Sequence, residues 1–433
     1  MANTPKEKNG GIFRSLKVRN YRLYFTGQAI SLCGTWMQTI GQDWLVLKLT
    51  GSGTQLGIVS AFQFLPILFL GPFGGMIADR FNKRKILYFT QSIAGVLALT
   101  LGTLVVTNQI HIWMIYIIAL CLGLVTMVDS PTRQTFAAEM VGDDYLTNAV
   151  TLNSTEINLA RAVGPAIAGI VIAVFGIGLC FLFNGVSYIA VLVVLAMMRK
   201  EELKPSKALV RAKGQLREGF RYVRNSPILL YTLIMMAIIG TLTYEFSISL
   251  PLLAQFTFHA GAGTYSALVT AMGLGSAVGG LYAATRKRVI PRILVLFALF
   301  FGVMFSITAF MPNVTLAIIT LLLVGFMSIN FTSMANTILQ LETDPQMRGR
   351  VMSLWTITFL GSTPIGGPII GFIGEHLGPR YGVLTGGLAA IVAAGAGALT
   401  LFKIKQPVPS PAAERAAQFE AEALNIQEDP KIR

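Results

Sequence analysis

The chain has 433 residues, of which 54% are hydrophobic and only 12% are charged. Soluble globular domains carry about 25% charged residues, so this composition excludes an ordinary soluble enzyme. The apolar runs are long and continuous, which also excludes an outer-membrane barrel, whose strands alternate in polarity. The net charge of +14 does not indicate a nucleic-acid partner, because the basic residues fall in short segments between apolar runs.

Twelve apolar segments follow one another along the chain, and each can cross a membrane as a helix of roughly 20 residues. Their limits are 21–47, 53–78, 84–107, 111–138, 148–174, 178–198, 227–254, 262–284, 290–311, 313–340, 351–374 and 379–403. We therefore predict an all-α polytopic membrane protein with twelve transmembrane helices.

The segments divide six and six about a long basic connection. The predicted domains are a tail (1–20), a six-helix bundle (21–198), a basic linker (199–226), a second six-helix bundle (227–403) and a disordered tail (404–433). In the linker, LREGFRYVR (216–224) has apolar residues at helical spacing. It fits an amphipathic helix on the inner leaflet and, equally, a mere tether.

The distribution of Lys and Arg predicts the orientation. With the N-terminus in the cytoplasm, 30 of the 34 basic residues lie in cytoplasmic turns, the linker and the two tails. The other four are Lys48, Arg133, Arg161 and Arg380. We therefore expect both termini to be cytoplasmic.

Two patterns recur six spans apart. GPFGGMIADRFNKRKIL (71–87) is matched by GSAVGGLYAATRKRVIPRIL (275–294), and GPAIAG (164–169) is matched by GPIIG (367–371). Parallel repeats of six spans, with the substrate path between them, are the plan of one large transporter class.

GMIADRFNKRK (75–85) resembles the loop motif of the major facilitator superfamily, and GPAIAG resembles its exporter-associated motif. The run from Asp129 to Asn184 is similar to the bacterial branch that includes enterobactin exporters and macrolide efflux proteins. The resemblance implies the major facilitator fold, the inner membrane of a bacterium and a monomer.

The resemblance also implies that the loop motif closes the cytoplasmic side. Its residues are Gly75, Asp79, Arg80, Lys83, Arg84 and Lys85. We expect Asp79 near the start of the helix that begins around Val351, and the basic residues near acids such as Glu139. The alternative is a positive-inside anchor with no gating role. Ala284 occupies the place of Asp79 in the second repeat, so the gating carboxylate is used once.

Ionisable residues inside spans are expensive and therefore informative. Asp129 and Arg133 are four residues apart and are expected to pair on one helix face. Glu156 and Arg161 are five apart, so they should find partners on other helices. Arg161 either contacts an anionic substrate group or neutralises Glu156 or Asp129, and we favour neutralisation.

Gly164 and Pro165 follow Arg161 directly, and we expect a hinge there because the backbone is thin and bent. Glycines elsewhere in the spans are expected to allow close helix contact. They are Gly169, Gly273, Gly275, Gly279, Gly366, Gly367 and Gly371.

Asp43 and Glu245 are the strongest functional candidates, since they lie in the first span of each repeat and lack basic neighbours on their own helices. In this superfamily those spans line the central cavity. A polar stripe leads to Asp43 along Gln28, Ser31, Thr35, Gln38 and Gln42, and Tyr244 adjoins Glu245. Either acid can carry a proton across the membrane. The alternative is an acid that packs the extracellular gate, capped by Tyr244 or Trp44.

The expected cavity is mostly apolar. Its candidate wall residues are Trp36, Phe62, Phe64, Phe246, Trp355 and Phe359. The three cysteines and three histidines show no spacing typical of a metal site or a disulfide framework, and no metal or cofactor is expected.

We therefore predict a proton-coupled secondary exporter of small amphipathic organic molecules, either drug-like or siderophore-like. Neither a nucleotide-binding signature nor a nucleophile beside a base is present, so the protein is not expected to be an enzyme. The alternatives are an importer or a lysophospholipid flippase on the same fold, or a membrane receptor without net transport.

Overall fold

The computed structural model describes residues 13–204, 215–286 and 290–403. The disordered tail predicted for 404–433 lies outside the described residues, as do most of the N-terminal tail, the middle of the linker and the basic residues at 287–288. The described residues form helices and turns, with no strand among them.

The first part of the chain forms η1 (Arg14–Lys17), α1 (Arg19–Thr50), α2 (Gly53–Arg80), α3 (Lys83–Val106), α4 (Ile112–Val141), α5 (Asp143–Phe175), α6 (Ile177–Met197) and η2 (Lys200–Glu202). The second part forms α7 (Gln215–Asn225), α8 (Pro227–Leu242), α9 (Phe246–Leu252), η3 (Leu253–Thr257), α10 (Ala262–Thr285), α11 (Pro291–Ala309), α12 (Val314–Leu341), α13 (Arg348–Phe359), α14 (Thr363–His376) and α15 (Pro379–Lys403). The all-α polytopic fold predicted from the sequence is confirmed.

Within the described residues, 11 helices are long and apolar enough to cross a membrane, with α8–η3 and α13–α14 each counted as one span. Helix α1, with 32 residues, is long enough to be the twelfth span, but its glutamines and Asp43 lower its mean hydropathy. These polar side chains are buried in the protein, which explains how α1 can still lie in a membrane.

Short turns place alternate helix ends on two opposite faces of the molecule. We call the face that carries the turns at 80–83, 198–204 and 342–348 the basic face, because Lys and Arg gather there. The distal face carries the turns at 51–52, 107–111, 258–261 and 310–313. At the distal face Gly51 ends α1 with a φ of 64°, a conformation that glycine adopts without strain.

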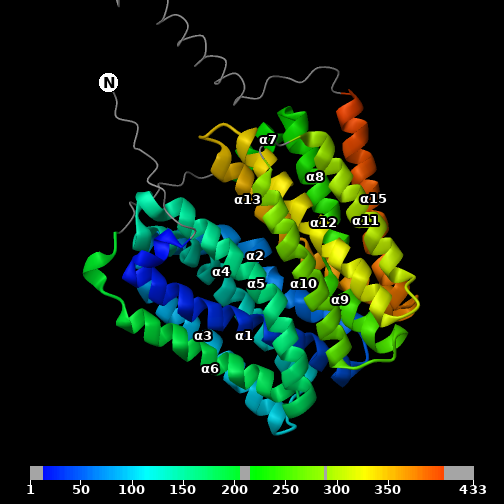
Figure 1. Cartoon of the computed structure of the whole chain (residues 1–433), viewed down its shortest axis with the longest axis horizontal. Coiled ribbons are helices and arrows are strands. Elements are labelled where there is room, and N and C mark those ends of the chain that lie inside the picture. The colour runs from blue at the N-terminus through cyan, green and yellow to red at the C-terminus, as the bar shows by residue number, and fades with distance from the viewer. Residues whose placement is uncertain (1–12, 205–214, 287–289, 404–433) are drawn as a thin grey trace, which may run out of the picture.

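Helices α1–α6 pack mainly on one another, and so do α8–α15 (Figure 1). The two groups meet along α2 against α14 and α5 against α10. Glycines allow α2 and α14 to approach closely, since a Cβ on Gly53 would lie 2.7 Å from the Gly371 carbonyl oxygen. The Ser52 hydroxyl also donates to the Glu375 carboxylate at 2.6 Å. Both contacts lie at the distal end of α2.

Two spans of the second group are interrupted near their middles. Between α8 and α9 the Tyr244 N–H donates to the Ile239 carbonyl, one residue earlier than the helical partner. Between α13 and α14 the chain turns at Leu360–Ser362. The breaks are adjacent, because a Cβ on Gly240 would lie 3.0 Å from the Ser362 hydroxyl. Discontinuous helices of this kind expose polar groups to a cavity inside a membrane protein.

The linker segment that the sequence left open is a helix, α7, docked on the second group. Val223 is buried in the core there, and Glu218 forms an ion pair with Arg350 of α13 at 2.7 Å. Phe220 remains exposed. The described end of the linker is therefore packed on protein and is more than a tether.

Candidate functional site

A central cavity of about 260 Å³ lies between the two groups of helices. Asp43 of α1, Arg161 of α5 and Glu245 at the α8–α9 break all line it, together with Tyr244. The structure thus brings together four of the residues that the sequence singled out. It leaves Gln38, Gln42 and Glu156 outside this lining.

Asp43 connects the two groups. Its carboxyl group accepts a hydrogen bond of 2.6 Å from the Tyr265 hydroxyl of α10, and the Ser247 side chain lies nearby. Tyr244, one of the two caps that the alternative interpretation offered, donates to the Ser328 carbonyl at 3.0 Å instead. Trp44 stacks on the ring of Tyr265, with centroids 6.4 Å apart.

Glu245 lies where span seven is broken and is 3% exposed. Its Oε1 atom is buried and has no hydrogen-bond partner, and the Thr363 side chain at the start of α14 lies near the carboxyl group. A Cβ on Gly366 would lie 3.0 Å from that Oε1 atom. Because Gly366 has no side chain, there is space beside it for the Glu245 carboxyl group.

Arg161 stacks over Trp36 of α1, with the guanidinium carbon 5.2 Å from the ring centroid. In the described part of the chain no carboxylate lies within ion-pair distance of it. The favoured expectation that Arg161 neutralises Glu156 or Asp129 is therefore wrong. Its side chain lines the central cavity, which neither of these acids lines.

Asp129 and Arg133 form the ion pair predicted from their spacing, inside the first group. Thr90 and Gln91 of α3 donate to Asp129, at 2.6 and 2.8 Å. Arg133 also donates to Gln28 of α1 at 2.6 Å. This network joins α1, α3 and α4, which supports a structural role. Glu156 of α5 is also buried.

Most of the polar stripe of α1 faces its own group and not the cavity. Gln38 accepts a hydrogen bond of 2.7 Å from Asn184 of α6, and Gln42 donates to Gln63 of α2 at 3.2 Å. The face of α1 that lines the cavity is Trp36, Thr39, Ile40 and Asp43. Gln38 and Gln42, which the stripe made candidates for proton coupling or substrate binding, therefore contact neighbouring helices and do not line the central cavity.

Four of the six expected wall aromatics line the cavity: Trp36, Phe64, Phe246 and Phe359. The other two, Phe62 and Trp355, do not line it, so that part of the prediction is wrong. Phe62 packs on Tyr116 with centroids 5.4 Å apart, and Trp355 stacks behind Phe359 at 5.8 Å. The wall is otherwise apolar, with hydroxyl groups at intervals, so it suits a ligand of mixed polarity.

The loop motif lies at the basic face. Lys83 forms the expected ion pair with Glu139 at 2.6 Å, and Arg84 donates to the Ala196 carbonyl at 3.3 Å. Gly75 is buried in α2, while Arg80 and Lys85 are exposed. Among the described residues, those that line the cavity around Asp79 belong to the first group and to the start of the linker. The ion pair of the motif is thus formed, but α13, near whose start Asp79 was expected, contributes no residue to the lining of this cavity.

The hinge candidate Gly164–Pro165 lies within the continuous helix α5. A Cβ on Gly164 would lie 2.5 Å from the Cβ of Trp36. This glycine therefore sets the distance between α5 and α1 beside the Arg161–Trp36 stack.

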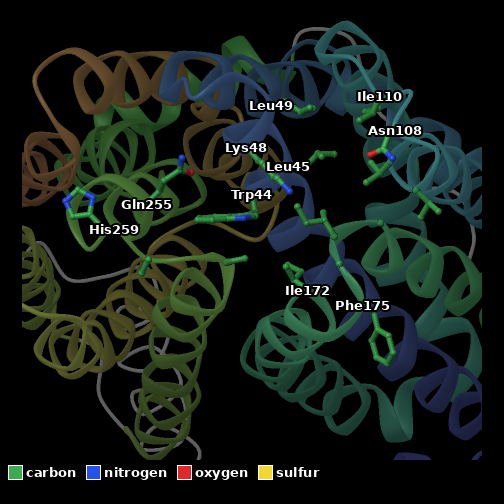
Figure 2. Close-up of a pocket in the computed structure, with 17 residues that line it drawn as sticks. Trp44, Leu45, Lys48, Leu49, Asn108, Ile110, Ile172, Phe175, Gln255 and His259 are labelled. Carbon is green, nitrogen blue, oxygen red and sulfur yellow. The ribbon is translucent and has the colours of Figure 1, made fainter.

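A second, larger pocket of about 1050 Å³ opens at the distal face. Figure 2 shows Trp44 and Lys48 of α1 between Gln255 and His259 on one side and Asn108 and Ile110 on the other. Trp44 lines this pocket, whereas its stacking partner Tyr265 lines the central cavity. The Trp44–Tyr265 pair therefore separates the two spaces.

The sequence did not point to Tyr265, Ser247 or Thr363, which lie beside the two acids. Single hydroxyl residues are common in membrane spans, and only the packing of α10 and α14 brings these three to the cavity. Among the described residues no group of three His, Cys, Asp or Glu could hold a metal ion.

Membrane-spanning helices in two groups, with an ionisable cavity where the groups meet, are the arrangement of a membrane transporter. The profile of the family described as "transmembrane secretion effector" matches residues 11–431. The chain belongs to this family of the major facilitator superfamily, and it is a transporter, not an enzyme.

Two relatives and two solved structures illustrate the likeness. A staphyloferrin A transporter of Staphylococcus aureus is 26% identical over 82% of this chain and 90% of its own length. An enterobactin exporter of Citrobacter koseri is 23% identical over 90% of this chain and 94% of its own.

The first structure is an inward-facing, unoccupied bacterial homologue of the human lysosomal transporter Spinster. It has a TM-score of 0.70 at 12% identity and covers 90% of this chain and 98% of its own. The second is a POT family transporter in complex with 5-aminolevulinic acid, with a TM-score of 0.72 at 12% identity, covering 90% and 97%. Both show the fold alone.

Proposed function

We propose that this protein is a proton-coupled exporter of small amphipathic organic molecules, drug-like or siderophore-like, that works by alternating access. One observation carries the proposal. Asp43 and Glu245 line the same buried cavity, and no Lys or Arg in the described part of the chain forms an ion pair with either. Each acid is therefore available to exchange a proton with water in the cavity.

The relatives support the direction and the substrate class. One is named as an exporter and one as a transporter of siderophores, and both align over most of this chain. The cavity fits this class, since it combines an aromatic wall with hydroxyl groups, two acids and one arginine. A lipid flippase and an importer remain outcomes of the test below.

The contacts between the groups support a conformation open toward the basic face. Close contacts lie at the distal ends of α2 and α14, and the Trp44–Tyr265 pair joins α1 to α10 beside the distal pocket. Toward the basic face, Ser154 and Thr155 of α5 and Ser353 and Thr356 of α13 are exposed. Exposed hydroxyl groups on spanning helices favour a water-filled opening over contact with lipid. Closure of this opening would bring the loop motif around Asp79 to the start of α13.

We infer that the basic face is cytoplasmic, that both termini lie there, and that the protein is a monomer of the bacterial inner membrane. The positive-inside distribution of Lys and Arg supports this orientation. In a cysteine-free background, an impermeant maleimide should label Asn313→Cys in intact cells and Asn82→Cys only after permeabilisation. The reverse pattern would invert the orientation.

Transport in proteoliposomes of known orientation, with an imposed pH gradient, tests the proposal. We expect gradient-driven movement of a drug-like or siderophore-like compound and loss of that coupling in Glu245→Gln, Asp43→Asn or both. Glu342→Gln, an acid outside the central cavity, is the matched control. Full coupling in both cavity variants would overturn the proton role. Movement of lysophospholipid alone would favour a flippase, and movement only in the opposite direction an importer.

A further inference from the structure

Arg161 is the one positively charged residue among those that line the central cavity. Its position is fixed on two sides. A Cβ on Gly273 of α10 would lie 2.9 Å from the Arg161 carbonyl oxygen, so α10 packs directly on its backbone. The guanidinium lies over the Trp36 ring on the other side. The side chain is therefore held at the cavity wall.

The charge of Arg161 is not compensated in the described part of the chain. No carboxylate lies within ion-pair distance, and its Nε atom is buried without a hydrogen-bond partner. Arg133, by contrast, pairs with Asp129 and Gln28. Arg84 and Arg286 also have a buried Nε atom without a partner, but Arg84 donates to the Ala196 carbonyl and Arg286 to Asn330, and neither lines the central cavity. An uncompensated buried cation is costly, and it is typically retained where a ligand supplies the opposite charge.

We propose that Arg161 and Trp36 form a subsite for the carboxylate of an amphipathic organic anion. A guanidinium offers a planar fork of N–H donors that matches a carboxylate, and stacking on an indole leaves the edge of that fork free. The apolar part of the ligand lies against Phe246 and Phe359, which line the same cavity. This inference rests on the proposed transport function and specifies its substrate class as organic anions.

Binding of two probes that differ only in charge tests the subsite. They are N-dansyl-phenylalanine and its methyl ester, and their binding to the purified full chain is followed by dansyl emission on tryptophan excitation. The wild-type protein should bind the acid at least about tenfold more tightly than the ester, equivalent to about 1.4 kcal/mol. Arg161→Gln should lose this preference and still bind the ester as the wild type does. Arg161→Lys should keep part of it, because the charge remains but the fork does not.

Arg286→Gln is the matched control, since Arg286 also stacks on aromatic rings but does not line the central cavity. It should keep the full preference for the acid. Equal binding of acid and ester by the wild type, no binding of either, or a preference that survives in Arg161→Gln would overturn the subsite.

The two proposals fail separately. Acid-selective binding through Arg161 without gradient-driven transport would leave the subsite standing and overturn the proton-coupled function. Gradient-driven transport that is equal for acid and ester and unchanged in Arg161→Gln would leave the proton-coupled function standing and overturn the subsite.

Discussion

The hydrogen bond from Tyr265 to Asp43 is the shortest polar link between α10 and α1 that faces the central cavity, at 2.6 Å. Tyr265 also stacks on Trp44, which lines the distal pocket. Removing the hydroxyl group should loosen the partition between the two spaces. A hydrogen bond contributes about 0.5–1.5 kcal/mol, which corresponds to a change of roughly two- to tenfold in an equilibrium.

We therefore expect Tyr265→Phe to increase access to the central cavity from the distal side by about two- to tenfold. The measurement is the labelling rate of Thr39→Cys, a cavity residue of α1, by an impermeant maleimide applied at the distal face. Tyr282→Phe is the control, because Tyr282 packs on Phe326 away from the cavity. An unchanged rate in Tyr265→Phe would show that the hydroxyl does not hold the partition closed.

The charged residues of the site could be predicted from the sequence, whereas the polar residues could not, because their partners depend on how the helices pack. Asp43, Glu245 and Arg161 stand out because ionisable residues are rare in apolar spans. The stripe through Gln38 and Gln42 was misleading, since a polar helix face can be satisfied by another helix as well as by a cavity. Asn184 and Gln63 provide those partners, and only the packing of α6 and α2 shows it.

Helix packing in this protein depends on small residues at particular crossings. Gly164 separates α5 from α1, and an added Cβ would lie 2.5 Å from the Trp36 Cβ and 2.9 Å from the Cys33 carbonyl oxygen. Because backbone atoms are involved, a rotamer change cannot relieve the clash. Gly164→Ala should destabilise the protein by about 1–3 kcal/mol.

The thermal unfolding midpoint of the purified protein measures this change. Gly395→Ala provides the comparison: Gly395 lies within α15, and nothing lies within 4 Å of its added Cβ. We expect an unchanged or higher midpoint there, since alanine favours a helix over glycine by about 1 kcal/mol. Equal midpoints for both variants would mean that α1 and α5 can move apart without cost.

Hydropathy predicted the extents of the helices well, because a lipid environment demands long apolar segments with internal hydrogen bonds. It did not predict the breaks at Thr243–Glu245 and Leu360–Ser362, since a break does not change the mean polarity of a span. Pro251 and Pro364 stand near these positions but do not by themselves locate them. The two-bundle division at 199–226 remains a prediction.

Alternating access requires the two groups of helices to separate at the distal face during each cycle. That face is held by glycine contacts between α2 and α14 and by Glu375, which accepts from the Ser52 hydroxyl at 2.6 Å and the Thr54 N–H at 2.9 Å. These hydrogen bonds fix the start of α2 to the end of α14. They must break if the substrate is to leave on that side.

A reversible cross-link at this point should therefore stop transport. In a background without Cys33, Cys121 and Cys180, which are free thiols, Ser52→Cys with Glu375→Cys should oxidise to a disulfide that abolishes transport until it is reduced. The control pair is Thr308→Cys with Thr320→Cys, whose hydroxyl groups lie 2.9 Å apart within the second group. Its cross-link should leave transport intact, because both helices move together. Full transport by the oxidised Ser52–Glu375 pair would mean that the groups do not part at the distal face, and substrate would have to follow another path.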